Sequence, residues 1–407
     1  MFVELHIIQN FPPSNLNRDD LGQPKDTDFG GYRRARISSQ CLKRATRYAG
    51  QNPATGTKPI FERYTGVPLA SRTKMIVDGL LERLMPDDDL KDQARAIAVE
   101  FARVYSSKKG KMDTKKPEQT SVLLYMAEQE LDEVADYLRA LPWAETVSEI
   151  ANLDSKKTKP ETRVNKSPLA KYVKKWITDT KGRTSAPDIA LFGRMLADRP
   201  ETNIDAACQV AHAISTHAID GRTPIDYFTA VDDLKTDPGA GFLDVAYFNS
   251  ACFYRYARVD FGQLKKNLGD DHDLACRSVE AFLRASEAAI PTGKKNAYAH
   301  ECRPSFMLAV LREKESDGWS LVNAFQKPVD ARSEGDLIAA SVKRLEKHFE
   351  HLISFYKVGD DDSVKAFAVA SPDGTVEEEL LSDTFRSKVK NMQGWIDAIC
   401  EPLRQGG

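Results

Sequence analysis

Hydrophobic and polar positions follow two different periods along this chain, and each period predicts a type of element. Short apolar or aromatic runs predict β-strands at 2–8, 252–259 and 305–311. Apolar residues that recur every three to four positions predict amphipathic helices at 271–290, 334–356 and 382–400. Because strands and helices of both kinds occur along one chain, the pattern predicts an α+β fold.

The middle of the chain has a helical pattern with almost no strand signal. Apolar spacing predicts helices at 71–85, 90–105 and 121–141, so this block is interpreted as a helical insertion. Residues 188–195 (DIALFGRM) favour a short strand or turn with a glycine break. Residues 206–217 fit either an alanine-rich helix or an alternating strand, and their β-branched side chains favour the strand.

Residues 221–250 differ from both patterns. Two extended, aromatic-bearing runs flank the turn-rich sequence DPGAG, which predicts a long β-hairpin. The predicted organisation is therefore a core interrupted twice: core 1–55, helical insertion 56–200, core strand 201–218, hairpin 219–251 and the remainder of the core at 252–407.

Composition restricts the class of protein. The chain has 407 residues, 29% of them charged, and a formal net charge of −2, so it has no overall attraction for nucleic acid. The six cysteines are scattered without a CxxC or a zinc-like pairing, which predicts free thiols and a cytoplasmic location. The N-terminus lacks the features of a signal peptide, and no segment approaches a membrane span. We expect no membrane partner and no cofactor.

Basic residues are nevertheless concentrated in a few segments. In the stretch from Asn17 to Arg47, a Gly30-Gly31 turn precedes a run without an acidic residue, and Ser38 or Ser39 is a good helix N-cap. The following helix would place Cys41, Leu42, Ala45, Tyr48 and Ala49 inward. Six cations lie in this acid-free run: Arg33, Arg34, Arg36, Lys43, Arg44 and Arg47. Such a face either binds phosphates or is simply solvated, and the absence of acids favours phosphate binding.

Other candidate sites carry open alternatives. The basic segments 108–116 and 156–183 are either solvated loops or nucleic-acid surfaces, and Tyr172 and Trp176 favour the second interpretation. The loop 291–299 is not a P-loop, but its Lys294 and Lys295 are candidate phosphate contacts. The aromatic side chains of 252–259 are better explained by core packing than by base stacking.

The acidic and imidazole groups do not predict a metal site. His217 lies five positions after His212, so on a strand their side chains point to opposite faces. Asp19 and Asp20, with Asp26 and Asp28, are more typical of turns and caps than of metal ligands. We therefore expect no resident metal.

Several segments, in order along the chain, match a known family. They are NLNRDDLGQPKDTDFGGYRRARISSQCLKRA (15–45), GRM (193–195), VAHAISTH (210–217), DYFTAVDDL (226–234), AGFL (240–243), FYRYA (253–257) and NAFQKPV (323–329). Together these motifs resemble the CasC/Cse-type backbone subunit of type I-E Cascade, the CRISPR surveillance complex. They cover most of the chain outside the helical insertion.

This resemblance implies a palm related to the RNA-recognition-motif fold, an inserted helical fingers domain and a thumb β-hairpin. It also implies that several copies assemble along a CRISPR guide RNA, and that each thumb displaces one nucleotide of the guide at regular intervals. The exposed guide bases would then pair with a target DNA strand. The implied partners are guide RNA, target DNA, further copies of the chain, and the large, small, handle-binding and repeat-processing Cascade subunits.

Residue roles follow from the matched motifs. The implied RNA-backbone contacts are Arg18, Lys25, Ser38, Gln40, Lys43, Arg44 and Arg47. Met195 would act as a wedge at the displaced nucleotide, and Tyr227, Phe228 and Thr229 would lie on the thumb beside the base gap. Tyr227 stands where a relative has tryptophan, so this chain departs from the pattern there. The lysines expected to meet target DNA are Lys108, Lys109, Lys111, Lys171, Lys174 and Lys175.

The resemblance implies a protein that is not an enzyme, because the type I backbone subunit is not a nuclease. Related type III backbone subunits cleave RNA with an aspartate in a palm loop, and the sequence leaves open whether Asp19 or Asp20 corresponds to it. Two alternatives therefore stand: a divalent-metal-dependent ribonuclease that uses Asp19, Asp20 or Asp232, and a single-stranded RNA coat protein outside CRISPR.

Overall fold

The computed structural model forms two compact units. It describes residues 1–407 except 86, 156–157, 220–224, 232–233, 235–239, 313–317, 357–363, 378, 380, 387–388, 390 and 407. The first unit comprises residues 1–60, 208–261 and 276–407, and the second comprises 61–207 and 262–275.

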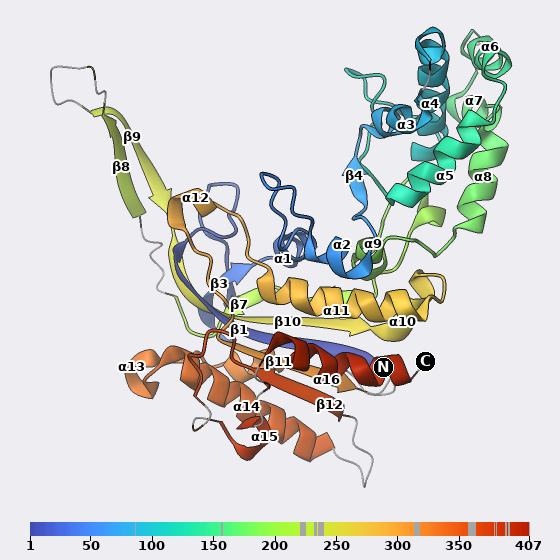
Figure 1. Cartoon of the computed structure of the whole chain (residues 1–407). Helices are drawn as coiled ribbons and strands as arrows, with labels where there is room; N and C mark the ends of the chain where they lie inside the picture. Colours follow the sequence, from blue (N-terminus) through green and yellow to red (C-terminus); the bar gives the residue numbers. More distant parts are fainter. Residues whose placement is uncertain are drawn as a thin grey trace. The chain divides into compact units, whose positions relative to one another are not determined.

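The first unit is built on an antiparallel sheet (Figure 1). Strand β1 (Phe2–Ser14) lies between β10 (Asn249–Asp260) and β11 (Phe306–Arg312), and it is antiparallel to both. Beyond β11 lies β12 (Val364–Ala370), at one edge of the sheet. Beyond β10 follow, in order, β7 (Ala213–Ser215), β3 (Tyr32–Ile37) and β2 (Asp26–Phe29). Strand β6 (Cys208–Val210) also pairs with β10. The predicted α+β class is confirmed, and 206–217 contains two short strands and no helix.

Helices cover both faces of this sheet. On one face, Ile8, Tyr254 and Leu308 belong to a core that includes residues of α14 (Leu337–Tyr356). On the other face lie α11 (His272–Ala288) and α16 (Met392–Gln405), and the indole of Trp395 in α16 donates a hydrogen bond to a backbone carbonyl of β12. Burial on both faces explains why β1 appears in the sequence as a nearly continuous apolar run.

The aromatic residues of β10 belong to the core of the first unit. Phe253 and Tyr254 are each 2% exposed, so the interpretation of core packing is confirmed for both. The Tyr254 hydroxyl lies 2.9 Å from Nδ1 of the fully buried His6. Burial, with a smaller effect from Arg312, lowers the pKa of His6 to about 3, so this imidazole is neutral at physiological pH.

The second unit is mainly helical. Its principal helices are α3 (Ile76–Leu84), α4 (Lys91–Ser106), α5 (Glu128–Arg139), α6 (Trp143–Asp154), α7 (Pro160–Asn165), α8 (Ala170–Asp179) and α9 (Pro187–Phe192). They enclose a core that includes Phe101, Val134 and Trp176.

Two expectations for the second unit are wrong. A short antiparallel pair, β4 (Ser71–Thr73) and β5 (Leu124–Met126), replaces the ends of two predicted helices. Each strand has only three residues, so cross-strand pairing overrides the helical spacing of the flanking sequence. Residues 188–195 were expected to be a strand or turn, but most of them belong to α9. This helix begins at Pro187, whose fixed φ suits a first helical position, and ends at Phe192, before Gly193.

Two further observations concern the whole of the described chain. None of the six cysteines forms a disulfide bond. Among the described residues, no helix is long and apolar enough to cross a membrane.

Candidate nucleic-acid interface

The opening stretch folds as a loop held against the start of α1 (Ser39–Arg47). The Asn17 side-chain oxygen accepts a hydrogen bond from the Ser38 backbone N–H at 2.8 Å, and the Lys25 N–H donates to the Asn17 carbonyl at 2.8 Å. Ser38 is the N-cap, because its hydroxyl oxygen accepts from the Cys41 N–H. The predicted cap is therefore confirmed, and the loop that carries Arg18 and Lys25 lies beside it.

Glycine is required at the turn between β2 and β3. Gly30 and Gly31 have φ values of 62° and 81°, the left-handed region that favours glycine. A Cβ atom on Gly30 would lie 2.1 Å from the carbonyl oxygen of Gln326. The Gly-Gly pair thus allows both the reversal of the chain and a close backbone approach.

Arg34 is not part of the basic surface, contrary to the expectation that all six cations share a phosphate-binding face. Its side chain is fully buried, and its guanidinium donates to four carbonyl oxygens, those of Ser215, Thr216, Phe325 and Gln326, at 2.7–3.2 Å. Burial, with a smaller effect from Arg344, lowers its pKa to about 10, so Arg34 remains a cation at neutral pH.

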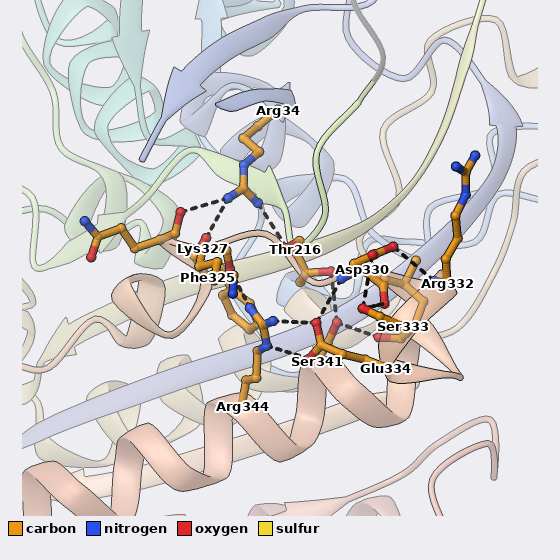
Figure 2. Close-up of polar contacts among 12 residues, drawn as sticks. Arg34, Thr216, Phe325, Lys327, Asp330, Arg332, Ser333, Glu334, Ser341 and Arg344 are labelled. Atoms are coloured by element: carbon orange, nitrogen blue, oxygen red, sulfur yellow. Dashed lines mark hydrogen bonds and ion pairs between the residues drawn. The ribbon is translucent and has the colours of Figure 1, made fainter. Parts of the chain in front are cut away.

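Figure 2 shows the segment 325–330 held between two arginines. Arg34 donates to the carbonyls of Phe325 and Gln326, while Arg344 donates to the Lys327 carbonyl and forms an ion pair with Glu334. The arginines on either side of Arg34 also have partners: Arg33 pairs with Asp26, and Arg36 contacts His212. These three residues therefore stabilise the strand that leads into α1.

Helix α1 presents its polar residues at the surface, but one of its buried positions differs from the expected pattern. Gln40 and Arg44 are exposed, and Lys43 and Arg47 are half-buried. Leu42 is buried as expected, but Thr46 takes the inward place expected for Tyr48, which is 36% exposed. The threonine is smaller and fits close to the sheet, whereas the tyrosine ring lies 5.0 Å from the guanidinium carbon of Arg44 and 5.1 Å from that of Arg47.

A loop distant in the sequence lies beside α1 and forms a cleft with it. The cleft has a volume of about 560 Å³ and is lined by Arg44, Tyr48, Lys295 and Arg303, among others. Two of the cations predicted as RNA contacts, Arg44 and Lys295, thus line the same cleft. Sequence reasoning missed Arg303, which has no local motif. The exposed Lys294 is next to Lys295 in the same loop.

The predicted hairpin contains a paired strand ladder. Strands β8 (Ile225–Val231) and β9 (Ala240–Tyr247) are antiparallel, with Phe228 opposite Asp244 and Thr229 opposite Leu243. Tyr227 is 68% exposed, and Phe228 and Thr229 are exposed as well. The hairpin therefore presents aromatic side chains to solvent. Asp232 lies outside the described residues.

In the second unit, Met195 is displayed on a rigid loop. Its side chain is 83% exposed, whereas the preceding Arg194 is buried and contacts both carboxylate oxygens of Glu130, at 2.8 and 3.0 Å. On the other side, the Leu196 N–H donates to the Asn203 side chain at 2.7 Å. An exposed methionine fixed in this way is suited to act as an apolar wedge.

The second unit also gathers lysines from both basic segments. Lys108, Lys171 and Lys174 line one cleft of about 910 Å³. Lys108 pairs with Glu201 at 3.6 Å, Lys109 with Glu161 at 3.9 Å and Lys175 with Asp179 at 2.7 Å. Lys111 is exposed.

The aromatic residues expected to add stacking to these lysines do not do so. Tyr172 stacks on Tyr137, and Trp176 is buried between Phe101 and Tyr105. Both rings belong to the packing of the helices, because the apolar face of α8 turns them inward.

The candidate metal ligands take part in local contacts. One carboxylate oxygen of Asp19 accepts from the N–H groups of Leu21 and Gln23, both at 2.9 Å, which is the role of a turn residue. In the part of the chain that the structure describes, no group of three or more His, Cys, Asp or Glu residues is placed to hold a metal ion.

Comparison with known proteins assigns the chain to a family. A family model described as CT1975-like protein matches residues 3–394. The chain belongs to this family. No curated protein matches it.

Solved structures agree with this assignment. One chain, from a structure described as a CRISPR RNA-guided surveillance complex, pre-nicking, has 30% sequence identity and a TM-score of 0.76; the match covers 99% of this chain and 100% of that one. Another, from a CRISPR RNA-guided surveillance complex, has 26% identity, a TM-score of 0.69 and coverage of 99% and 100%. These matches confirm the resemblance to a Cascade subunit inferred from the sequence motifs.

Proposed function

We propose that this protein is a non-catalytic backbone subunit of a Cascade-type CRISPR surveillance complex. It binds guide RNA, assembles along it with further copies of itself, and presents it for pairing with target DNA in antiviral defence. The observation that carries the proposal is the cationic face of α1, with Lys43, Arg44 and Arg47, from which Arg44 lines one cleft together with Lys295 of a second loop.

Cations of this kind suit a protein that must accept any guide sequence. Ammonium and guanidinium groups neutralise phosphates without reading base edges. Ser38 and Gln40 at the start of α1 add neutral donors, because a hydroxyl that accepts at a helix cap can still donate its own proton. Arg18 and Lys25, on the adjoining loop, extend the same surface.

The parts of the fold take the names that the family suggests. The sheet of the first unit is an RNA-recognition-motif-like palm, the helical unit is the fingers, and the β8–β9 hairpin is the thumb. Met195 on its fixed loop supplies the wedge at a displaced nucleotide, and Tyr227, Phe228 and Thr229 on the thumb border the gap in the guide.

We assign the contacts with target DNA to the helical second unit. Lys108, Lys171 and Lys174, which share one cleft, contact the DNA backbone together with the neighbouring Lys109, Lys111 and Lys175. The large, small, handle-binding and repeat-processing subunits complete the complex, which works in the cytoplasm.

A cleavage assay separates this function from that of a ribonuclease. Guide-bound protein incubated with complementary RNA and Mg²⁺ should leave both strands intact, because Asp19 is engaged in a turn and Asp26 in an ion pair. Gel electrophoresis of labelled RNA, with EDTA as control, gives the measurement. Magnesium-dependent cleavage that disappears in Asp19→Ala, Asp20→Ala or Asp232→Ala would identify a ribonuclease instead.

A further inference from the structure

The cleft between the end of α1 and the loop 291–303 has the chemistry of an anion site. Its three cationic side chains come from two parts of the first unit: Arg44 from α1, and Lys295 and Arg303 from the loop. Tyr48, Gln51 and Thr292 add polar groups to the lining, and Glu301 is the acid among its lining residues.

Close backbone contacts fix the loop that forms the second wall. A Cβ atom on Gly293 would lie 2.5 Å from the carbonyl oxygen of Leu16 and 2.6 Å from that of Asn15, so the loop approaches the opening stretch as closely as glycine allows. The buried His300 closes the loop, since its Nε2 lies 2.9 Å from the Pro291 carbonyl. The cations of this wall are therefore preorganised before any ligand arrives.

Two of the cations have carboxylate partners, of which Glu301 is 59% exposed and Glu287 is 9% exposed. Lys295 pairs with Glu301 at 2.5 Å, and Arg303 pairs with Glu287 at 2.9 Å. The exposed pair of Lys295 with Glu301 contributes little stability, so a phosphate can take over this lysine at small cost. Arg303 donates to Glu287 through Nη1, so the other donors of its 62% exposed side chain can bind a phosphate while that pair is kept. A phosphodiester offers two non-bridging oxygens, which suit the planar guanidinium fork as the two oxygens of a carboxylate do.

We propose that this cleft is a subsite for one phosphodiester of the bound RNA, held by Arg44, Lys295 and Arg303, and that Tyr48 is the positioning residue of the subsite. The proposal rests on the proposed function, because it adds a contact to the same RNA path. It assigns a role to Arg303 and Tyr48, which no sequence motif singled out.

Tyr48 acts through the arginines rather than on the RNA itself. Its ring lies 5.0 Å from the guanidinium carbon of Arg44 and 5.1 Å from that of Arg47, within the range of cation–π attraction. Long arginine side chains lose considerable rotamer freedom when they bind a phosphate. A ring that holds both guanidinium groups reduces this entropy loss and directs Arg44 toward the cleft.

The first test is the salt dependence of binding to a short single-stranded RNA, measured by fluorescence anisotropy on the full chain. Arg303→Ala should lower the slope of log K against log salt by about 0.7 and weaken binding about fivefold at about 0.1 M salt. Arg303→Lys keeps the charge and should restore the slope. The matched control is Arg386→Ala, an exposed arginine that is also paired with a carboxylate (58% exposed, against 62% for Arg303).

The second test looks for tighter RNA binding, a result that a misfolded variant would not give. Glu301→Gln removes the acid that competes for Lys295, so RNA should bind about twofold to fourfold more tightly. Tyr48→Leu should weaken binding about threefold to tenfold without changing the salt slope, and Tyr48→Phe should match the unsubstituted protein.

The outcomes distinguish this proposal from the proposed function. If the unsubstituted chain binds RNA, but Arg303→Ala keeps its slope and Glu301→Gln brings no gain, the subsite is wrong while the function stands. If the unsubstituted chain does not bind RNA, the proposed function itself fails. Replacement of chloride by inorganic phosphate at constant ionic strength should weaken RNA binding to the unsubstituted chain more than to Arg303→Ala; an equal effect on both would mean that phosphate competes elsewhere and would overturn the subsite.

Discussion

Replacing Lys43 and Arg47 together with alanine is expected to weaken binding to RNA of any sequence about 25-fold at about 0.1 M salt. Each residue lies on the polar side of α1, four positions apart, so each can neutralise one phosphate. Loss of one contact to single-stranded RNA lowers the salt slope by about 0.7, so the pair should lower it by about 1.4. Anisotropy titrations at several salt concentrations, with two RNAs of unrelated sequence, measure both quantities.

Helix α14 offers a matched control for this pair. Lys343 and Lys347 are exposed, lie four positions apart and belong to the same unit. Their double replacement by alanine removes the same number of charges away from α1, and RNA binding should keep its slope. Equal losses in the two double variants would mean that RNA responds only to net charge, and α1 would not be the RNA surface.

Replacing Arg34 with methionine is expected to lower the free energy of unfolding by about 3 kcal/mol or more. The substitution keeps much of the apolar volume but removes the guanidinium donor from four backbone carbonyl oxygens, of which that of Thr216 keeps a bond from the Val329 N–H. Urea unfolding followed by circular dichroism measures the change.

Arg33→Met is the control for this substitution, because the two arginines are neighbours on the same strand. Arg33 is exposed and pairs with Asp26 at the surface, so its loss should cost less than about 1 kcal/mol. If Arg34→Met proved as mild as Arg33→Met, the carbonyls would have found other donors, and Arg34 would not hold β3 to the segment 325–330.

Arg33 and Arg34 also show what could not be predicted from the sequence alone. The basic run predicts a cationic surface, and α1 with its Ser38 cap follows the helical pattern closely. Successive residues of a strand point to opposite faces, so Arg33 and Arg34 meet different surroundings, and one of them is buried. The sequence alone does not say which, because the choice depends on carbonyl groups near residues 215 and 325, far away in the chain.

Other features differ in how far local sequence determines them. The central strands were predictable, because burial on both faces requires an unbroken apolar run at 2–8 and 305–311. The pair β4–β5 was not, since three-residue strands leave no measurable periodicity. Arg303 becomes part of the candidate interface only because the fold brings the loop 291–303 to the end of α1, some 250 residues earlier in the chain.

The central claim, assembly of many copies along one guide, is tested most directly by the mass of the complex as a function of RNA length. Native mass spectrometry or analytical ultracentrifugation would be performed with single-stranded RNAs of increasing length. The number of protein copies per RNA should rise in equal steps as nucleotides are added, independently of base sequence. A single copy per RNA at every length would contradict the account.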